Sequence, residues 1–464
     1  MPNTQLHYMT ISELGRLLKS RKISAVEVTE TMLGRIDALD HSYKGYATVM
    51  PDHAMRAARI ADDEIRRGNY IGPLHGVPIA VKDLCFTNGV RTMGGCKVME
   101  NHIPAFDATV VSRLASAGSV LLGKLNLTEG AMGGYNPFFY VPLNPWNTQR
   151  WAGASSSGSG VATALGLCYG SLGSDTGGSI RFPAAACGVV GLKPTWGRVS
   201  RYGVLALAES LDHVGPLTRS SIDAAIMLDA ISGVDPNDST TIPMDPSDIL
   251  ATIEQDSDEY SIEGIRVGLD RDYVTCGIDP ELSQAVLDSV AALENLGADI
   301  VEVNMPDVDQ YASYWSTLCS VEALAAHRDF YPSRRDDYGL YFREWLDTGA
   351  KVSALDYVKA NNKRNECNGL VRLAMRDVDV LVCPSMPGPP YEITMEQMYG
   401  GLDPDRDPAF QRFAVPFNYN GYPTLSVPCG LNQAGLPLSL QFVGHPLSEP
   451  LLCRIGHAFE LLIQ

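Results

Sequence analysis

Strand-like runs of apolar residues alternate with helical segments along this chain, and no other feature of the sequence constrains the fold as strongly. The run GIRVGL at 264–269 precedes apolar residues at helical spacing over 282–293, and the run DIVEV at 299–303 follows. This order is typical of a β-α-β unit. Further strand-like runs lie at 77–81, 119–123, 379–383, 424–430 and 438–444. Strands that alternate with helices predict an α/β fold.

The N-terminal part of the chain is predicted to be helical. Thr10 and Ser24 each begin an S/T-x-x-E capping box, which Glu13 and Glu27 complete. Apolar residues at helical spacing follow each box. We therefore expect an α-helical layer over about residues 1–70.

The domain organisation is predicted from the lack of a linker. The 464 residues would suffice for two or three average domains, but no long stretch is rich in proline, serine and glycine. The acidic segment 245–260 is the best candidate for a loop that crosses between two halves. We expect one domain over 1–464, with two lobes as the alternative.

Charge and composition restrict the partners. The chain has 36 Lys and Arg against 54 Asp and Glu, a formal charge of −18 without a basic patch, so no nucleic acid or acidic membrane partner is expected. No run of eighteen apolar residues and no secretory signal pattern occur, which leaves the cytoplasm as the expected location. The ten cysteines lack the spacing of a zinc site, so we expect buried free thiols and no metal.

The segment 151–194 has the most unusual composition. Glycine and serine dominate it, but alanine, valine, leucine and cysteine are interleaved, which is not typical of a flexible linker. A phosphate-binding loop is not expected, because Ser159 stands where its lysine would be. A dinucleotide-binding motif also fails, because Thr163 replaces the third glycine.

Acyl transfer fits this segment better. In SDTGGSI, residues 174–180, the N–H groups of Thr176, Gly177, Gly178 and Ser179 can point into one concavity, because glycine permits such backbone conformations. They would form an oxyanion hole for a tetrahedral intermediate. Ser179, at the edge of this nest, is the candidate nucleophile.

The base that would activate Ser179 is left open by these patterns. All nine histidines lie outside 151–194, and His213, beside Asp212, is interpreted as a surface or structural residue. Lys82 ends the apolar strand run in GVPIAVKDL, and a lysine can act as a base when burial keeps it neutral. Taken alone, a lysine after a strand is more often a surface residue.

Three motifs resemble a known family. GVPIAVKDL, WAGASSSGSG and GSDTGGSIRFPAAACGVVGLKPTWGRVSRYG occur in this order and closely resemble the amidase signature family of hydrolases. The resemblance runs from about residue 10 to near residue 444 and is densest over 74–216. It implies a single large α/β domain with a central twisted mixed β-sheet surrounded by α-helices. It also implies hydrolysis of small-molecule amides without a cofactor.

The resemblance implies a catalytic set of one lysine and two serines. Lys82 corresponds to the base, and Ser179 to the nucleophile that forms the acyl-enzyme. Ser155 corresponds to a bridging serine whose preceding peptide bond is cis in the family. Asp175 and Arg181, which flank the nucleophile, are interpreted as fixing the loop by hydrogen bonds and charge pairing.

The region of the bridging serine departs from the family's pattern. Two of its glycines are replaced, by Ala154 and Ser157. Since Ser157 adds a second hydroxyl, Ser156 or Ser157 is the alternative to Ser155 as the proton relay.

Two other segments bear on the substrate. In the loop after Lys124, we expect Ala131, Met132 and Tyr135 to line the acyl side of the pocket. The aromatic-rich stretch 311–345, in a C-terminal lobe with a helical cap over about 305–375, is either a packed cap or a hydrophobic lid. Both predict an apolar or aryl substrate such as an anilide, an aryl or fatty amide, or a carbamate (urethane), and esters should also react.

The alternatives are a non-catalytic scaffold of the same fold and a glutaminase subunit of the amidotransferase type. The segment NPFFYVPLNPW lacks the TENSAFGPTRNPW pattern of the family's amidotransferase subunit, and GYPTLSVPCG looks more like stand-alone amidases. An independent hydrolase, monomeric or as a homodimer, is therefore favoured.

Overall fold

One β-sheet runs through the part of the chain that the computed structural model describes, which comprises residues 6–243, 249–250, 261–402 and 409–463. Within these residues the sheet has 11 strands. In spatial order they are β1 (Tyr46–Val49), β3 (Val120–Leu125), β2 (Pro78–Lys82), β4 (Gly170–Asp175), β6 (His213–Thr218), β5 (Val190–Lys193), β10 (Thr424–Leu431), β11 (Pro437–Gly444), β9 (Val380–Pro384), β7 (Arg266–Leu269) and β8 (Asp299–Glu302).

The sheet is mixed, as predicted. Strand β2 pairs in parallel with β3 and β4, and β7 pairs in parallel with β8 and β9, whereas the central strands pair antiparallel. Each strand-like run named from the sequence overlaps one of these strands. The expected β-α-β unit is present as β7, α10 (Pro280–Asn295) and β8, with Val267 opposite Ile300. The predicted α/β fold class is confirmed.

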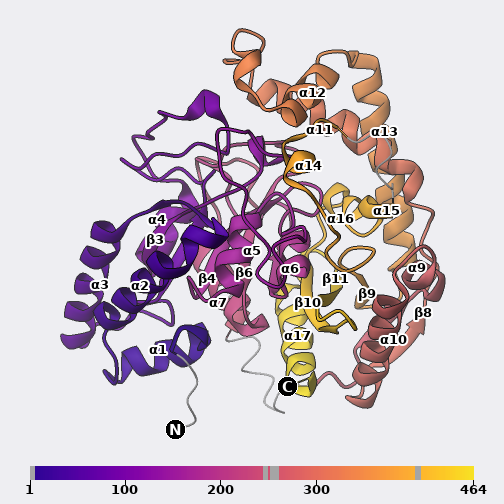
Figure 1. Cartoon of the computed structure of the whole chain (residues 1–464). Helices are drawn as coiled ribbons and strands as arrows, with labels where there is room; N and C mark the ends of the chain where they lie inside the picture. The colour runs from indigo at the N-terminus through magenta and orange to yellow at the C-terminus, as the bar shows by residue number, and fades with distance from the viewer. Residues whose placement is uncertain (1–5, 244–248, 251–260, 403–408, 464) are drawn as a thin grey trace.

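Helices surround the sheet (Figure 1). The two N-terminal capping boxes form: the hydroxyls of Thr10 and Ser24 accept from the N–H groups of Glu13 and Glu27 at 3.0 and 3.1 Å. The described helices are α1 (Ile11–Lys19), α2 (Ala25–Tyr43), α3 (Pro51–Arg66), α4 (Thr109–Ser116), α5 (Ser157–Ala164), α6 (Arg181–Cys187), α7 (Ser221–Ile231), α9 (Arg271–Thr275), α10, α11 (Ala312–Ala326), α12 (Leu340–Gly349), α13 (Ala354–Ala374), α14 (Met395–Tyr399), α15 (Ala409–Arg412), α16 (Val415–Tyr419) and α17 (Glu449–Ile463).

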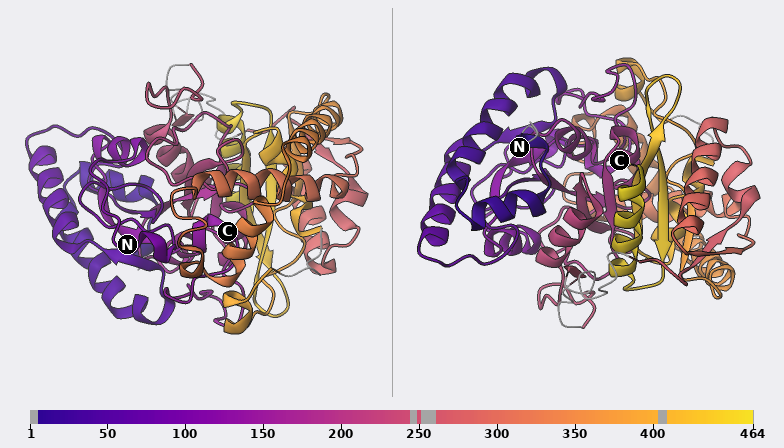
Figure 2. Two further views of the ribbon diagram at one scale, coloured as in Figure 1. Left: turned by 90° about the horizontal axis from the view of Figure 1, so that it is seen from above. Right: turned by 90° about the horizontal axis from the view of Figure 1, so that it is seen from below.

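The helices occupy distinct sides of the molecule. Figure 1 shows α1 to α3 at one side and α9 and α10 at the opposite side, with the strands between them. Helix α11 packs against α12 and α13. Figure 1 shows α11 and α12 at the top of the molecule and α13 at its right-hand edge. Both views in Figure 2 show the indigo N-terminal helices at one edge of the molecule.

The parallel strands β2 and β4 position Lys82 and the loop that carries Ser179. Val81 of β2 is opposite Leu172 of β4, so the carboxyl ends of both strands meet at the same edge of the sheet. Strand β2 ends at Lys82, and β4 ends at Asp175, directly before the Thr176–Ser179 loop and α6. The fold thereby brings two distant sequence motifs together.

The cysteines of this chain form no disulfide bond. All ten are unpaired and eight are buried, whereas Cys276 is exposed and Cys429 is partly buried. Of the acidic segment 245–260, only residues 249–250 lie among the described residues. Along the described part of the chain, no helix combines the length and the apolar character that a membrane crossing requires.

Candidate active site

Lys82 lies at the centre of a buried cluster of hydroxyl groups. Its side chain is fully buried, and its Nζ atom lies 2.7 Å from Ser155 Oγ and 2.9 Å from the Oγ atoms of Ser156 and Ser174. Burial lowers the pKa of Lys82 from 10.5 to about 7, although nearby acidic groups act in the opposite direction. A substantial fraction of this lysine is therefore neutral at pH 7, with a lone pair that can accept a proton.

The three consecutive serines have different partners. The Ala154–Ser155 peptide bond is cis. Ser156 Oγ donates to the carbonyl oxygen of Ser174 at 3.2 Å, so its single hydrogen is already engaged. Ser157 Oγ accepts from the Tyr135 hydroxyl at 2.8 Å. Ser155 and Ser156 contact Lys82, and of these two only Ser155 has a hydroxyl hydrogen without another protein acceptor in the described structure.

The loop after β4 requires its two glycines. A Cβ atom on Gly177 would lie 2.5 Å from Trp315 Cζ2, and one on Gly178, whose φ is +112°, would lie 2.4 Å from Phe182 Cε2. Glycine adopts such backbone angles without steric cost. Trp315 Nε1 also donates to the carbonyl oxygen of Thr176 at 2.9 Å. These contacts hold the loop in one conformation.

The loop presents three amide groups rather than four. Among the described residues, the N–H groups of Thr176, Gly177 and Ser179 have no hydrogen-bond acceptor. The N–H of Gly178 differs from the prediction, because it donates to Asp175 Oδ1 at 2.8 Å. The sequence could not reveal this bond, since it depends on the direction of the turn.

A buried ion pair supports the loop from beneath. Arg181 Nε and Nη2 lie 3.0 and 2.9 Å from the two carboxylate oxygens of Asp175, and both residues are fully buried. Burial alone would raise the pKa of Asp175, but the Arg181 guanidinium holds it well below its usual range. Asp175 Oδ2 also accepts from the Ile180 N–H at 3.0 Å. These bonds agree with the interpretation of Asp175 and Arg181 as residues that fix the loop.

His213 is a buried structural residue. Its Nδ1 atom lies 2.7 Å from the carbonyl oxygen of Leu211 and 3.1 Å from that of Asp175. Burial lowers the pKa of His213 well below its ordinary value. The Asp212 carboxylate accepts from the Thr176 hydroxyl at 2.6 Å, and no bond to His213 is present in the described structure. The two residues therefore do not form a catalytic pair.

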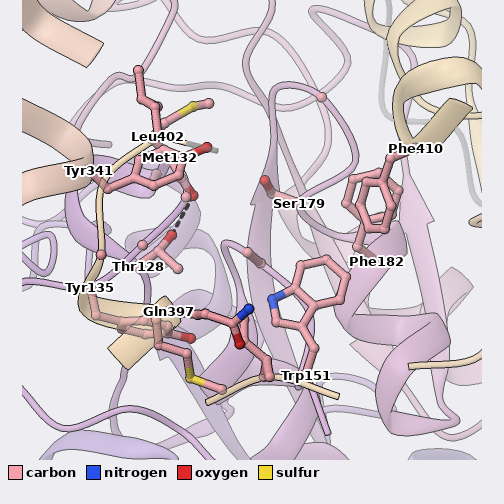
Figure 3. Close-up of a pocket in the computed structure, with 18 of the residues that line it drawn as sticks. Thr128, Met132, Tyr135, Trp151, Ser179, Phe182, Tyr341, Gln397, Leu402 and Phe410 are labelled. Carbon is pink, nitrogen blue, oxygen red and sulfur yellow. Dashed lines mark hydrogen bonds between the residues drawn. The ribbon is translucent and has the colours of Figure 1, made fainter. Parts of the chain in front are cut away.

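A cavity of about 780 Å³ opens at Ser179. Figure 3 shows Met132, Tyr135 and Tyr341 on one side of Ser179, and Trp151, Phe182 and Phe410 on the other. Ala131, Met132 and Tyr135, named from the sequence, all line this cavity. No Lys, Arg or His is among the described residues of its lining, whereas Glu392 and Glu396 are.

The aromatic-rich segment 311–345 contributes one wall of the cavity. Trp315 and Tyr341 line it, whereas Phe342 and Trp345 are buried behind. A Cβ atom on Gly134 would lie 2.5 Å from Tyr341 Cβ. In this structure the segment therefore packs on the loop that carries Met132.

A second group of lining residues was not found from the sequence. We call it the aromatic wall: Trp151, Phe182, Tyr391 and Phe410. The ring centroids of Trp151 and Tyr391 are 5.1 Å apart, and those of Phe182 and Phe410 are 4.8 Å apart. These residues come from separate segments of the chain without a shared pattern.

No group of three or more His, Cys, Asp or Glu side chains that could hold a metal occurs in the described residues.

Comparisons with known proteins place the chain among the amidases. The amidase family model matches residues 27–453. The chain is 44% identical over 456 residues to the protein named Putative amidase AmiD of Mycobacterium tuberculosis, covering 97% of this chain and 94% of that protein. It is 37% identical over 482 residues to a subunit of the glutamyl-tRNA(Gln) amidotransferase of Geobacter metallireducens, covering 98% and 97%. The solved peptide amidase of Stenotrophomonas maltophilia matches with a TM-score of 0.85 and 29% identity, over 99% of this chain and 97% of that one.

Proposed function

Because the chain belongs to the amidase signature family, we propose that it hydrolyses the C–N bond of amides through an acyl-enzyme on Ser179. The observation that carries this proposal is the contact between Lys82 and Ser155. A buried lysine with a pKa of about 7 lies 2.7 Å from a serine hydroxyl, at the edge of the sheet where the Ser179 loop begins. This arrangement supplies the base that a serine nucleophile needs.

The proposed reaction begins with attack by Ser179 Oγ on the amide carbonyl carbon. The proton of Ser179 passes to Ser155 Oγ as the proton of Ser155 passes to neutral Lys82 Nζ. The carbonyl electron pair moves to the oxygen, which the free N–H groups of Thr176, Gly177 and Ser179 stabilise.

The second half of the reaction returns the protons. The tetrahedral intermediate collapses, the C–N bond breaks, and the proton held on Lys82 returns through Ser155 to the leaving nitrogen. Water then attacks the acyl-enzyme with the same relay, which releases the acid and restores Ser179.

The lining of the cavity supports an apolar or aryl substrate. Met132, the aromatic wall and Tyr341 offer apolar and aromatic surface on both sides of Ser179. Among the described lining residues there is no cation to pair with a substrate carboxylate. We therefore favour anilides, aryl or fatty amides and carbamates, with ester hydrolysis as an accompanying activity.

The glutaminase alternative is less well supported by the same cavity. Glutamine would bring a carboxylate next to Glu392 and Glu396, without a lining Lys, Arg or His in the described residues. The similarity to an amidotransferase component keeps this alternative open to test. A non-catalytic scaffold would not need the neutral lysine and its serine neighbours.

A substrate panel tests the proposal. The purified chain, without partners, is assayed against anilides, primary aryl and fatty amides, carbamates, esters and glutamine, with Ser179→Ala as the matched control. We expect hydrolysis of the aryl or fatty compounds that is lost in Ser179→Ala. Turnover of glutamine alone would contradict the proposed substrate class, and equal activity of Ser179→Ala would contradict the mechanism.

A further inference from the structure

A second cavity, of about 480 Å³, lies between α3 and α4. It has no described lining residue in common with the cavity at Ser179. Figure 1 shows α3, α4 and β3 at the same side of the molecule. Cavities of roughly 300 to 1,000 Å³ are typical of small-molecule sites. The proposed reaction makes no use of this cavity, although it is large enough for a ligand.

Apolar side chains make up most of the lining of this cavity. They come from α3, α4 and the strands behind them, and include Ala57, Ile60, Val111, Leu114, Ile79 and Val81. Ile60 and Ile71, which also lines the cavity, are 60% and 48% exposed. A ligand with an apolar body would therefore cover surface that now faces water.

Helix α3 provides an apolar wall with a polar group at either end. His53, Ala57, Ile60 and Glu64 recur at intervals of three and four residues, so they lie on one face of the helix. His53 and Glu64 are eleven residues apart, which corresponds to roughly 16 Å along the helix axis. The cavity is therefore elongated, with Glu64 at one end.

The charged groups of the lining are acidic. Glu64 and Asp107 contribute carboxylates, and no lysine or arginine is among the described residues of this lining. Asp107 Oδ1 accepts from the Asn88 N–H at 2.7 Å, so part of this carboxylate is already engaged. The lining therefore favours a cationic ligand over an anionic one.

The ring of His75 leaves the charge of Glu64 uncompensated. His75 Nδ1 accepts from the Ile71 N–H at 3.3 Å, so this nitrogen carries no hydrogen and the ring is neutral. The His75 Nε2–H therefore donates to Glu64 Oε2 at 3.0 Å. In the part of the chain that the structure describes, Glu64 pairs with no lysine or arginine, and its Oε1 atom accepts no hydrogen bond.

We propose that this cavity binds a small apolar amine, with its ammonium group at Glu64 and its apolar body between α3 and α4. The ammonium group supplies a positive charge and N–H donors for the free carboxylate oxygen. The apolar body would cover Ile60 and Ile71. This inference goes beyond the proposed function and does not depend on it, so Ser179→Ala should bind the amine like the unmodified chain.

Calorimetric titration of the full-length Ser179→Ala chain tests the binding without turnover. The probes are 4-phenylbutylamine, 4-phenylbutan-1-ol and 4-phenylbutyrate, which share an apolar body and differ in charge. We expect saturable binding of the amine, about three- to tenfold weaker binding of the alcohol, and still weaker binding of the carboxylate. An amine that does not bind, or an alcohol or carboxylate that binds as tightly as the amine, overturns the proposal.

A charge substitution tests the position of the ammonium group. Glu64→Gln should weaken amine binding by about three- to tenfold and leave alcohol binding within about twofold, because the amide oxygen can still accept from His75. The matched control is Asp63→Asn, which removes the same charge from the same turn of α3. The Asp63 side chain is 53% exposed and does not line the cavity. Equal affinities of the two variants for the amine would overturn the assignment to Glu64.

A bulky substitution shows which cavity is occupied, since the cavity at Ser179 also has two lining glutamates. Ala57→Phe places a ring in the cavity beside α3 and should remove one bound amine per chain. The control is Ala292→Phe on α10, because Ala292 is partly buried like Ala57 and does not line this cavity. Circular dichroism on both variants checks that they fold. A folded Ala57→Phe chain that binds the amine with unchanged affinity and stoichiometry overturns the proposal.

Discussion

The Nζ atom of Lys82 lies 2.7 Å from Ser155 Oγ, and neither side chain has any exposed surface. Burial lowers the pKa of Lys82 to about 7, and the base in the proposed reaction is the deprotonated form. At a pH below 7 the lysine becomes protonated and can no longer accept the proton from Ser155.

The first prediction concerns pH. The kcat/KM for a neutral anilide should be constant above pH 7 to 8 and fall about tenfold per unit as the pH decreases below 7. The measurement is a pH profile with a check that the protein remains folded. Full activity retained at pH 5 would show that Lys82 is not the base.

The second prediction separates the neighbouring serines. Ser155→Ala should lower kcat by about 10²- to 10⁴-fold, because it removes the relay. Ser156→Ala should lower it by less than about tenfold, since the Ser156 hydroxyl donates to Ser174 and its loss removes one hydrogen bond to Lys82. Steady-state kinetics of the two variants distinguish the roles, and a larger loss in Ser156→Ala would assign the relay to Ser156.

The third prediction concerns the ion pair beneath the nucleophile. Asp175→Asn should lower the free energy of unfolding by about 3 to 5 kcal/mol, because it leaves Arg181 buried without its countercharge. Urea unfolding measures the loss, with the exposed Asp288→Asn on α10 as the control. A change below about 1 kcal/mol would mean that Asp175 does not stabilise the loop as described.

The fourth prediction concerns the free amide groups. Gly177→Ala should lower kcat by about 10²- to 10³-fold, because its Cβ atom would meet the Trp315 ring and displace the loop. Gly34→Ala is the matched control, since nothing lies within 4 Å of a Cβ atom there. If Gly177→Ala retains the activity of the Gly34→Ala control, the loop does not need its observed conformation.

Local patterns in the sequence predicted most of the fold. The capping boxes at Thr10 and Ser24 and the β-α-β unit over 264–303 depend on neighbouring residues, so they could be recognised without tertiary information. The position of Lys82 could be predicted only in part. The sequence predicted the strand that Lys82 ends, but the burial of Lys82 beside Ser155 follows from the parallel pairing of β2 with β4.

The parts of the site that the sequence did not reveal depend on contacts between distant segments. The aromatic wall joins Trp151 and Phe182 to Tyr391 and Phe410, and nothing in the local sequence connects them. The bond from the Gly178 N–H to Asp175 likewise depends on the three-dimensional course of the turn.

The central claim is that Ser179 is the nucleophile, and covalent labelling tests it most directly. The intact chain is treated with a serine-directed fluorophosphonate and analysed by peptide mass spectrometry, with Ser179→Ala and Lys82→Ala as controls. The account predicts one added group per chain on Ser179, none in Ser179→Ala and much slower labelling in Lys82→Ala. A folded chain that remains unlabelled, or one labelled at a different serine, would contradict it.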